Sequence, residues 1–342
     1  MLPRKVSKEF IEGLPKSELH VHLEGTLEPE LKLKLAKKNN IDIGQSTIED
    51  VEATYHYTSL ASFLAVYYPG MNVLQTESDF YELAMAYLKK AHEQGVVHTE
   101  MFFDPQAHII RGVPLNYVIN GFYQACVDAR AFGIDAQLIM CFLRDMSARS
   151  AMDLLNAAQP YHNKILGICL DSYEHHNPPL KFMQPFSLAV EQGYHITMHA
   201  DVDQIDSIEH IKQALEIINV ERLDHGTNIV ENKDLVDWVN QLHLGLTSCP
   251  LSNELITDND LKGDEILDLL DIGVKVSINS DDPAYFGGYI ADNYWALASE
   301  YKVTPEQIVQ LAKNSIETSW ISKEQKQLYL EQIDKYVEEY DG

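Results

Sequence analysis

The chain has 342 residues, 45% hydrophobic and 23% charged, which excludes disordered, collagen-like and disulfide-stapled proteins and allows one large domain. Its 26 basic and 52 acidic residues give a formal net charge of −26 at pH 7. This charge repels phosphate backbones and anionic lipid headgroups, so we expect neither a nucleic-acid partner nor a membrane partner.

The sequence carries no sign of export or of a disulfide framework. The segment MLPRKVSKEFIEGLPK at residues 1–16 lacks the apolar stretch of a signal peptide, and no apolar run approaches the roughly 18 residues of a membrane span. We therefore expect a cytoplasmic protein with reduced thiols. The four cysteines are scattered without a CxxC pair: Cys126, Cys141, Cys169 and Cys249.

Short apolar segments rich in branched residues alternate with longer segments of helical periodicity, which is the pattern of repeated β-α units and a parallel sheet. Eight such units favour a closed (β/α)8 TIM barrel over an open doubly wound sheet, and no GxGxxG follows the first strand. The prediction is one α/β domain over residues 1–342. The expected strands lie at 18–23, 97–103, 137–142, 165–170, 195–199, 222–225, 245–247 and 274–279.

The widest gap between expected strands runs from about residue 27 to residue 94 and has helical spacing at 29–38, 59–73 and 78–93. In a barrel, the segments that follow the strand ends form the face where ligands bind, so this helical insertion is expected to cover a pocket. Two further amphipathic helices are expected at the carboxyl end of the chain, at 304–320 and 323–340.

The first expected strand ends with two histidines, His20 and His22, separated by one residue. Side chains at i and i+2 of a strand point to the same face, so both imidazoles can face the mouth of the barrel. Imidazole nitrogens and carboxylate oxygens are usual ligands of zinc. The HxH pattern is also common in surface strands and needs support from elsewhere in the chain.

Three other expected strands end in polar clusters. His199 ends one strand and is followed by Asp201, His225 ends the next, and the paired Asp281 and Asp282 follow the last. Each cluster alone is typical of a helix cap or a satisfied core residue. Because the carboxyl ends of parallel strands meet at one face of a barrel, their coincidence favours a mononuclear metal site there.

Five motifs follow one another along nearly the whole chain: HxH at 20–22, His199, LDHG at 223–226, SCPLSN at 248–253 and SDDP at 280–283. In this order and at these intervals they resemble the adenosine and adenine deaminases of the metal-dependent amidohydrolase superfamily. The adenine deaminase branch is more similar than the nucleoside branch in three stretches: HLEGTLEPE at 22–30, FFDPQ at 102–106 and DDPAYFGGY at 281–289.

The resemblance implies a (β/α) barrel that holds one zinc ion through His20, His22, His199 and Asp281, although these donors also accept Fe²⁺, Mn²⁺ or Co²⁺. A cation in this shell lowers the pKa of water from 15.7 toward roughly 7. The implied nucleophile is therefore a metal-bound hydroxide and not a side chain.

The resemblance also implies roles for three residues beside the metal. His225 lies next to the attacking water and accepts its proton, and Asp281 accepts a hydrogen bond from the same water. Asp282 hydrogen-bonds the five-membered ring of the purine. Because Pro283 suits the start of a helix, an N-cap role is the alternative for Asp282.

One position departs from the family pattern His-Ala-Gly-Glu, whose glutamate protonates N1 of the purine. Here Val202 stands at the place of the glutamate, between Asp201 and Asp203. Three interpretations are open: a neighbouring aspartate, Asp203 ahead of Asp201, is the acid; water or an arrangement for another 6-substituted heterocycle supplies the proton; or the chain is a weak or inactive deaminase. An aspartate in this role needs a raised pKa, because near 3.9 it would be ionised.

Glu24 stands where the nucleoside deaminases of the family usually have an aspartate that reaches a ribose hydroxyl. Its extra methylene fills the space that a sugar needs, so a free base is expected, unless Glu24 merely caps a helix. The sequence thus predicts an enzyme that hydrolyses adenine to hypoxanthine and ammonia. The alternatives are deamination of N6-substituted adenines or of adenosine, and a purine-binding protein that has lost catalysis.

Overall fold

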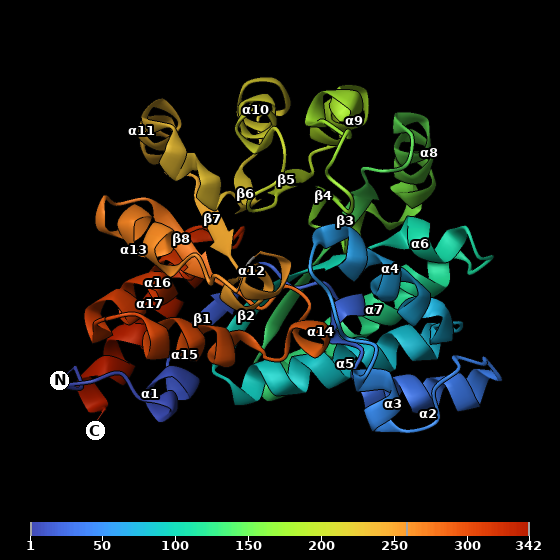
Figure 1. The fold of residues 1–342 in the computed structure, drawn as a ribbon, viewed down its shortest axis with the longest axis horizontal. Coiled ribbons are helices and arrows are strands. Elements are labelled where there is room, and N and C mark those ends of the chain that lie inside the picture. The colour runs from blue at the N-terminus through green and yellow to red at the C-terminus, as the bar shows by residue number, and fades with distance from the viewer. Residues whose placement is uncertain (1, 258, 341–342) are drawn as a thin grey trace.

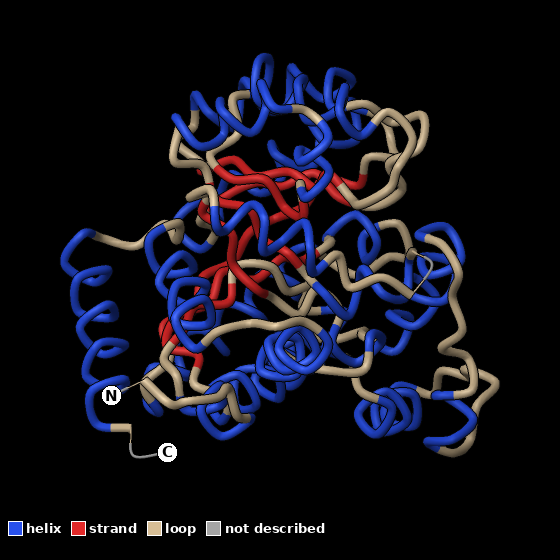
Figure 2. The backbone as a smooth tube through the Cα atoms, turned by 60° about the vertical axis from the view of Figure 1, so that its left-hand side comes forward, coloured by secondary structure: helices blue, strands red, loops and turns tan. Residues whose placement is uncertain are grey.

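The computed structural model describes residues 2–257 and 259–340. A sheet of eight parallel strands in sequence order lies at the centre and is surrounded by helices (Figures 1 and 2). This is the β-α repeat that the sequence predicts. The strands are β1 (Lys16–Glu18), β2 (Val96–Phe103), β3 (Asp135–Leu143), β4 (Gly167–Asp171), β5 (His195–Ala200), β6 (Arg222–His225), β7 (Gly245–Ser248) and β8 (Lys275–Ile278).

The sheet closes between its first and last strands. Val21 and Asp281 form a parallel bridge beyond the ends of β1 and β8. The His22 N–H donates to the Asp281 carbonyl (2.9 Å), and the Asp281 N–H donates to the His20 carbonyl (3.0 Å). These contacts complete a nearly closed barrel, so the fold class is confirmed.

The first strand differs from its prediction, whereas the other seven agree to within two residues at each end. The regular strand covers Lys16–Glu18 and not 18–23, and its pairing with β2 shifts register between Lys16 and Ser17. Beyond it, the Leu19 N–H donates to the Asn279 side chain (2.7 Å) and not to a neighbouring backbone. The two histidines of the HxH motif therefore lie on an irregular extension of the strand.

Amphipathic helices pack on the outside of the sheet and form one large apolar core with it. In α11, for example, Asn232 caps the first turn by accepting from the Leu235 N–H (3.2 Å), and Leu235, Val236 and Val239 are buried. The helices between and after the strands are α7 (Leu115–Ala129), α8 (Ala148–Ala158), α9 (Met183–Glu191), α10 (Ser207–Gln213), α11 (Lys233–Gln241), α13 (Gly263–Asp271), α15 (Ile290–Glu300) and α16 (Pro305–Glu317).

The insertion between β1 and β2 is helical, as predicted. Within it, α4 (Leu60–Gly70) begins at a capping box in which Ser59 and Ser62 satisfy each other's backbone N–H groups. Short helices also follow β2, β7 and β8 directly: α6 (Pro105–Ile109), α12 (Pro250–Ile256) and α14 (Pro283–Phe286). The helices of the insertion are α2 (Pro29–Asn39), α3 (Ile48–Glu52), α4 (Leu60–Gly70) and α5 (Glu77–Glu93).

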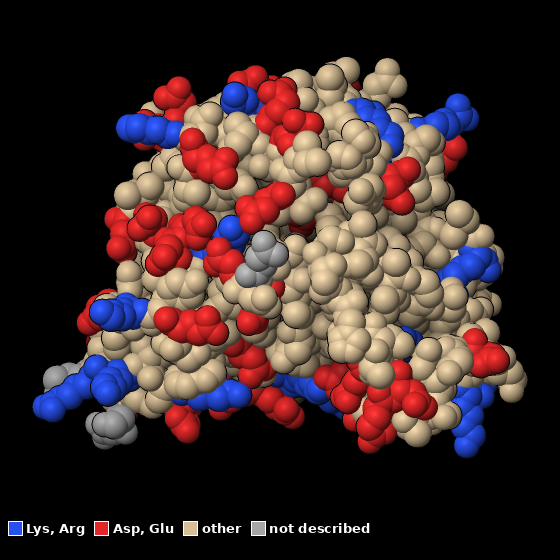
Figure 3. All heavy atoms as spheres, in the orientation of Figure 1, with Lys and Arg blue, Asp and Glu red and all other residues tan. Residues whose placement is uncertain are grey.

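The two ends of the chain lie side by side, where α1 (Lys8–Gly13) meets α17 (Lys323–Glu339) (Figures 1 and 2). The Tyr336 hydroxyl donates to the Phe10 carbonyl (3.1 Å) across this contact. Acidic side chains are spread over the face shown in Figure 3. Among the described residues, no helix has the length and hydropathy needed to cross a membrane.

Candidate active site

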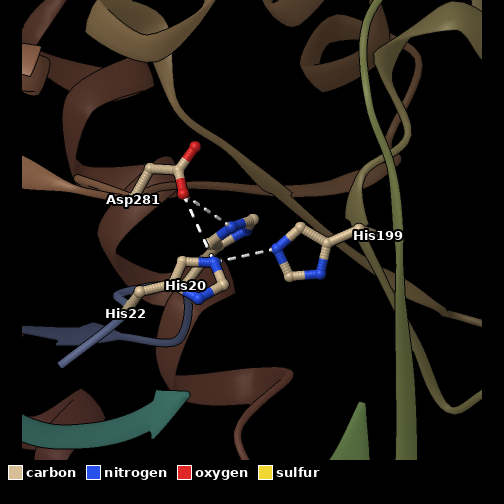
Figure 4. Close-up of side chains that lie close together, drawn as sticks. All are labelled: His20, His22, His199 and Asp281. Atoms are coloured by element: carbon tan, nitrogen blue, oxygen red, sulfur yellow. Dashed lines mark hydrogen bonds and ion pairs between the residues drawn. The ribbon is translucent and has the colours of Figure 1, made fainter. Parts of the chain in front are cut away.

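Three histidines and one aspartate meet at the carboxyl end of the barrel (Figure 4). His20 and His22 follow β1, His199 lies in β5, and Asp281 follows β8. The His22 and His199 Nε2 atoms are 3.0 Å apart, and Asp281 Oδ1 lies 3.3 Å from His20 Nε2 and 3.5 Å from His22 Nε2. All four side chains are buried. They form one metal-binding site built from three strand ends.

The other ring nitrogen of each histidine faces a partner farther from this centre. His20 Nδ1 contacts the Thr247 hydroxyl (2.8 Å), His22 Nδ1 faces Asp171 (3.5 Å), and His199 Nδ1 lies 3.7 Å from Asp224. The Thr247 hydroxyl donates to Asp224 (3.0 Å) and so accepts the proton on Nδ1 of His20, and the carboxylates near His22 and His199 favour the same tautomer. They leave the Nε2 lone pairs directed toward a common point.

The donor set fits a cation. With Nδ1 protonated, the Nε2 lone pairs of His22 and His199 face each other at 3.0 Å, an arrangement that a bound cation stabilises. Burial, followed by the neighbouring His20 and His22, lowers the pKa of His199 well below its usual value and keeps its ring neutral. Although burial opposes it, His20 and the other histidines lower the pKa of Asp281, which remains ionised. Neutral imidazole and ionised carboxylate are the forms that bind metal ions.

His225 lies against the same centre, at the end of β6. Its Nε2 is 2.8 Å from Asp201 Oδ1 and 3.7 Å from Asp281 Oδ2. Burial lowers the pKa of His225, but Asp201 and Asp281 outweigh burial and raise the pKa to about 9. The backbones of His225 (φ 59°) and Asp281 (φ 62°) are left-handed, a strained conformation that clusters at functional sites.

The structure separates the two aspartates that flank Val202. Asp201 is buried, lines the cavity beside His225, and its N–H donates to Glu174 (3.0 Å). The Asp203 side chain is 47% exposed and pairs with Lys262 (2.8 Å), so Asp203 does not reach the cavity. Val202 is buried in the apolar core. The left-handed turn at Asp203 (φ 55°) accompanies its ion pair with Lys262, so of the two candidates Asp201 is the one that lies at the cavity.

Asp282 lines the cavity and does not cap the helix that follows it. It occupies the N-cap position of α14, but its side chain makes no capping hydrogen bond, and its buried Oδ1 has no partner. Burial, followed by the charge of Asp281, raises the pKa of Asp282 well above its usual value. A Cβ at Gly25 would lie 1.9 Å from Asp282 Oδ1, so only glycine allows this close approach. Asp282 thus presents a buried carboxyl to the cavity.

Glu24 is buried but does not line the cavity. Its Oε1 accepts hydrogen bonds from His108 Nε2 (2.8 Å) and from the Asp104 N–H (3.1 Å). Glu24 therefore lies behind Asp104, outside the cavity, and does not reach the position where it could contact a substrate.

A cavity lies above the metal-binding centre, and His22, His199, His225 and Asp281 are among its lining residues. Its polar wall carries Asp104 and Asp171 besides the residues described above, and no Lys or Arg is among its described lining residues. The apolar wall is one face of α4, where i, i+3, i+4, i+7 and i+8 point inward. The residues on this face are Leu60, Phe63, Leu64, Tyr67 and Tyr68.

Sequence reasoning assigned no role to Asp104 or Asp171. Asp104 belongs to the FFDPQ stretch, and Asp171 follows the residues expected for the fourth strand, so both carried the strand-end signal that identified the histidines. The outer partner Thr247 carried no such signal, because its contact with His20 joins residues distant in the sequence. The apolar face of α4 is predictable from the periodicity of the sequence. The sequence does not indicate which side of the insertion faces the barrel.

Comparison with known proteins agrees with this geometry. The family model described as adenosine deaminase matches residues 15–336. An adenine deaminase of Zymomonas mobilis is 45% identical, covering 97% of this chain and 98% of the relative. A crystal structure of an adenine deaminase from Arthrobacter aurescens is 41% identical, covering 95% of this chain and 99% of that one, with a TM-score of 0.91.

A more distant solved structure shares the fold. It is an amidohydrolase from Burkholderia ambifaria with bound zinc, 22% identical, with a TM-score of 0.87, and the match covers 98% of this chain and 95% of that one. The extent of the family match and the identity to its members, together with the buried histidine and aspartate centre, lead to one assignment. The chain belongs to the adenosine deaminase family.

Proposed function

We propose that this protein hydrolyses the 6-amino group of adenine, with water as the nucleophile, giving hypoxanthine and ammonia. The observation that carries the proposal is the convergence of the four metal-binding side chains with His225, Asp201 and Asp282 around one cavity. The relatives named adenine deaminase, at 41% and 45% identity over nearly the full chain, support the same substrate.

His20, His22, His199 and Asp281 are the residues that would hold the metal ion, and their nitrogen and oxygen donors suit zinc. The zinc in the distant amidohydrolase supports this choice. When bound, such an ion is a Lewis acid that makes water a nucleophile near neutral pH.

His225 shares one proton with Asp201 across their 2.8 Å contact, and when that proton lies on Asp201 the neutral imidazole is placed to accept the proton of the attacking water. Its ring lies between Asp201 and Asp281, within 3.7 Å of both carboxylates. These carboxylates stabilise the protonated imidazole that results from the transfer, and they orient Nε2 toward the metal-binding centre.

Attack at C6 loads negative charge on N1 of the purine, so the site needs an acid on that side. Asp201 is the aspartate of the 201–203 loop that reaches the cavity, and we assign the acid to it in place of the glutamate of the family. It contacts His225, so a proton taken from the water has a short path back to N1. On the other side of C6, Asp282 donates a hydrogen bond to N7 in its protonated form, which its burial and the charge of Asp281 favour.

The charge of the cavity favours an uncharged purine over a nucleotide. None of the described residues that line the cavity is a lysine or an arginine that could pair with a phosphate, and five of them are aspartates: Asp104, Asp171, Asp201, Asp281 and Asp282. A phosphate brought into this wall would be repelled and left unpaired. The apolar face of α4 offers the planar ring a surface on which to pack.

The test is ammonia release from adenine, N6-methyladenine, adenosine and AMP, by protein whose metal content has been measured. We expect adenine to give the highest kcat/KM and AMP the lowest. Faster release of methylamine from N6-methyladenine would redirect the proposal to N6-substituted adenines, and preference for adenosine would redirect it to nucleosides. If metal-loaded protein releases no amine from any of the four, the chain is not a deaminase.

A further inference from the structure

Asp104 and Asp171 are two buried carboxyls on the cavity wall; Asp171 faces the outer nitrogen of His22, whereas Asp104 takes no part in the metal-binding centre or in the proton transfers. Asp104 follows β2 and Asp171 ends β4, and their exposed fractions are 1% and 2%. Oδ1 of each has no hydrogen-bond partner. A buried polar atom without a partner is costly, so a group of the bound purine is expected to satisfy Oδ1 of Asp104.

The strand order determines which edge of the purine faces Asp104. The strands run in sequence around the barrel, so β2 lies opposite β6 across its axis. If C6 faces His225 on β6, N1 faces Asp201 after β5 and N7 faces Asp282 after β8. The remaining edge of the ring, which carries N3 and N9, then turns toward β2 and therefore toward Asp104.

In free adenine, N9 carries a hydrogen and is a donor, whereas in a nucleoside N9 is bonded to the sugar. We propose that Oδ1 of Asp104 accepts a hydrogen bond from N9–H of the bound purine and so selects the free base. This inference rests on the proposed function, because it takes the orientation of the ring from that function. An aspartate and an aspartic acid both offer an acceptor oxygen, so the interaction does not depend on the protonation state of Asp104.

The surroundings of Asp104 hold it in place for this contact. Its N–H donates to Glu24 Oε1 (3.1 Å), and Glu24 is itself anchored by His108 Nε2 (2.8 Å). Pro105 begins α6 immediately after Asp104 and restricts its backbone. Glu24 is therefore a positioning residue that acts on the substrate through Asp104, which explains how a residue outside the cavity can favour a free base.

The first test uses the unaltered enzyme with adenine and 9-methyladenine, which differ at N9 alone. We expect kcat/KM for 9-methyladenine to be at least about 100-fold lower, because a site built to pair with a donor rejects an analogue that lacks it. Equal kcat/KM values for the two purines would overturn the inference and leave the proposed function intact. Absence of turnover with adenine and with every other 6-aminopurine would instead overturn the proposed function.

The second test separates the hydrogen bond from simple crowding at N9. Asp104→Leu keeps the bulk but removes the acceptor, so kcat/KM for adenine should fall about 10- to 100-fold while the low value for 9-methyladenine changes little. Asp104→Asn keeps an acceptor oxygen and should stay within about fivefold of the unaltered enzyme. Asp145→Asn, on the exposed segment after β3, is the matched carboxyl-to-amide control.

Metal content is measured for each variant to separate substrate recognition from damage to the metal-binding centre. The inference holds if Asp104→Leu retains its metal and loses discrimination between the two purines by at least tenfold. It is overturned if Asp104→Leu retains both its metal and its full discrimination. If Asp104→Leu fails to fold, adenine and 9-methyladenine are compared on the unaltered enzyme and on Asp104→Asn. An Asp104→Asn variant whose turnover of adenine falls to the level seen with AMP would contradict the acceptor role.

Discussion

The two ends of the barrel use the same kinds of side chain in opposite ways. Toward the amino ends of the strands, Glu100 on β2 accepts from Arg222 Nη1 (2.5 Å), His98 Nε2 (3.1 Å) and the Trp320 N–H (2.5 Å). The Arg222 guanidinium also stacks on the Trp320 ring, 4.1 Å from its centroid. At the carboxyl ends, Asp104 and Asp282 each have a buried oxygen without a partner.

The pKa values of the carboxyls differ between the two ends of the barrel in the same way. Burial alone would raise the pKa of Glu100, but Arg222 and His98 outweigh it and lower the pKa to about 2. Burial raises the pKa of Asp171 to about 6, with His22 opposing, and raises the pKa of Asp282 well above its usual value. Glu100 at the amino end has fixed internal partners, whereas Asp171 and Asp282 at the carboxyl end face the cavity, where a metal ion or a substrate binds.

The largest effect is expected from breaking the metal-binding centre. Asp281→Ala and His20→Ala should each lose the bound metal and reduce adenine turnover to background, because no neighbouring side chain can replace the missing ligand. The measurement is metal content together with ammonia release. Full metal occupancy and intact activity in both variants would show that the centre is assigned to the wrong residues.

At the opposite end, Glu100→Gln should cost stability and not activity. It leaves the buried Arg222 without its nearest carboxylate, so the free energy of unfolding should fall by about 3–5 kcal/mol. Because the pKa of Glu100 is lowered on folding, its contribution is complete above the unfolded value near 4.5 and is lost as the pH falls toward about 2.

Urea unfolding of the unaltered protein and of Glu100→Gln at several pH values checks this prediction, with the exposed Glu339→Gln as control. The two unfolding free energies should differ most above pH 4.5 and converge toward pH 2. A loss of kcat/KM in folded Glu100→Gln would mean that the two ends of the barrel are not independent.

At the carboxyl end of the barrel, substitution of the two aspartates that flank Val202 should have very different effects on kcat. Asp201→Asn keeps the shape of the side chain but removes the transferable proton, so kcat should fall by about 10²–10⁴ with the metal retained. Asp203→Asn disturbs the ion pair with Lys262 and should have a far smaller effect. Steady-state kinetics with adenine compare the two. If Asp203→Asn is the more damaging variant, the acid lies on the other side of Val202.

His225→Ala should leave the metal in place and lower kcat by about 10² or more, the effect of removing a general base. The contacts of His225 with Asp201 (2.8 Å) and Asp281 (3.7 Å) place it next to the ligands, outside the four-residue donor set. Metal analysis of the purified variant, alongside its turnover of adenine, separates the two roles. Loss of the metal would make His225 a ligand.

The fold and the metal-binding residues were accessible from the sequence because both follow local patterns. The eight strands follow from apolar runs between helical segments. Polar residues at the carboxyl ends of parallel strands predict a metal site at one face of the barrel, and the resemblance to the deaminase family implies the set His20, His22, His199 and Asp281.

The finer parts of the site were not accessible, because they depend on contacts between distant segments. The sequence prediction puts Asp203 ahead of Asp201, and nothing local to the loop reveals that Asp203 pairs with Lys262. The sequence predicts that Glu24 faces the substrate. Nothing local reveals its hydrogen bonds to His108 and to the Asp104 N–H, because these bonds join separate segments of the chain. Proximity in sequence located the right loops but not the direction in which their side chains point.

We infer that the carboxyl end of the barrel deaminates adenine with one metal ion per chain. The direct measurement strips the protein with a chelator, adds zinc in steps, and follows hypoxanthine and ammonia formation from adenine at each step. Activity should rise in proportion to the zinc bound and level off at one equivalent per chain. Activity that persists in the stripped protein, or that needs a second equivalent, would contradict the claim.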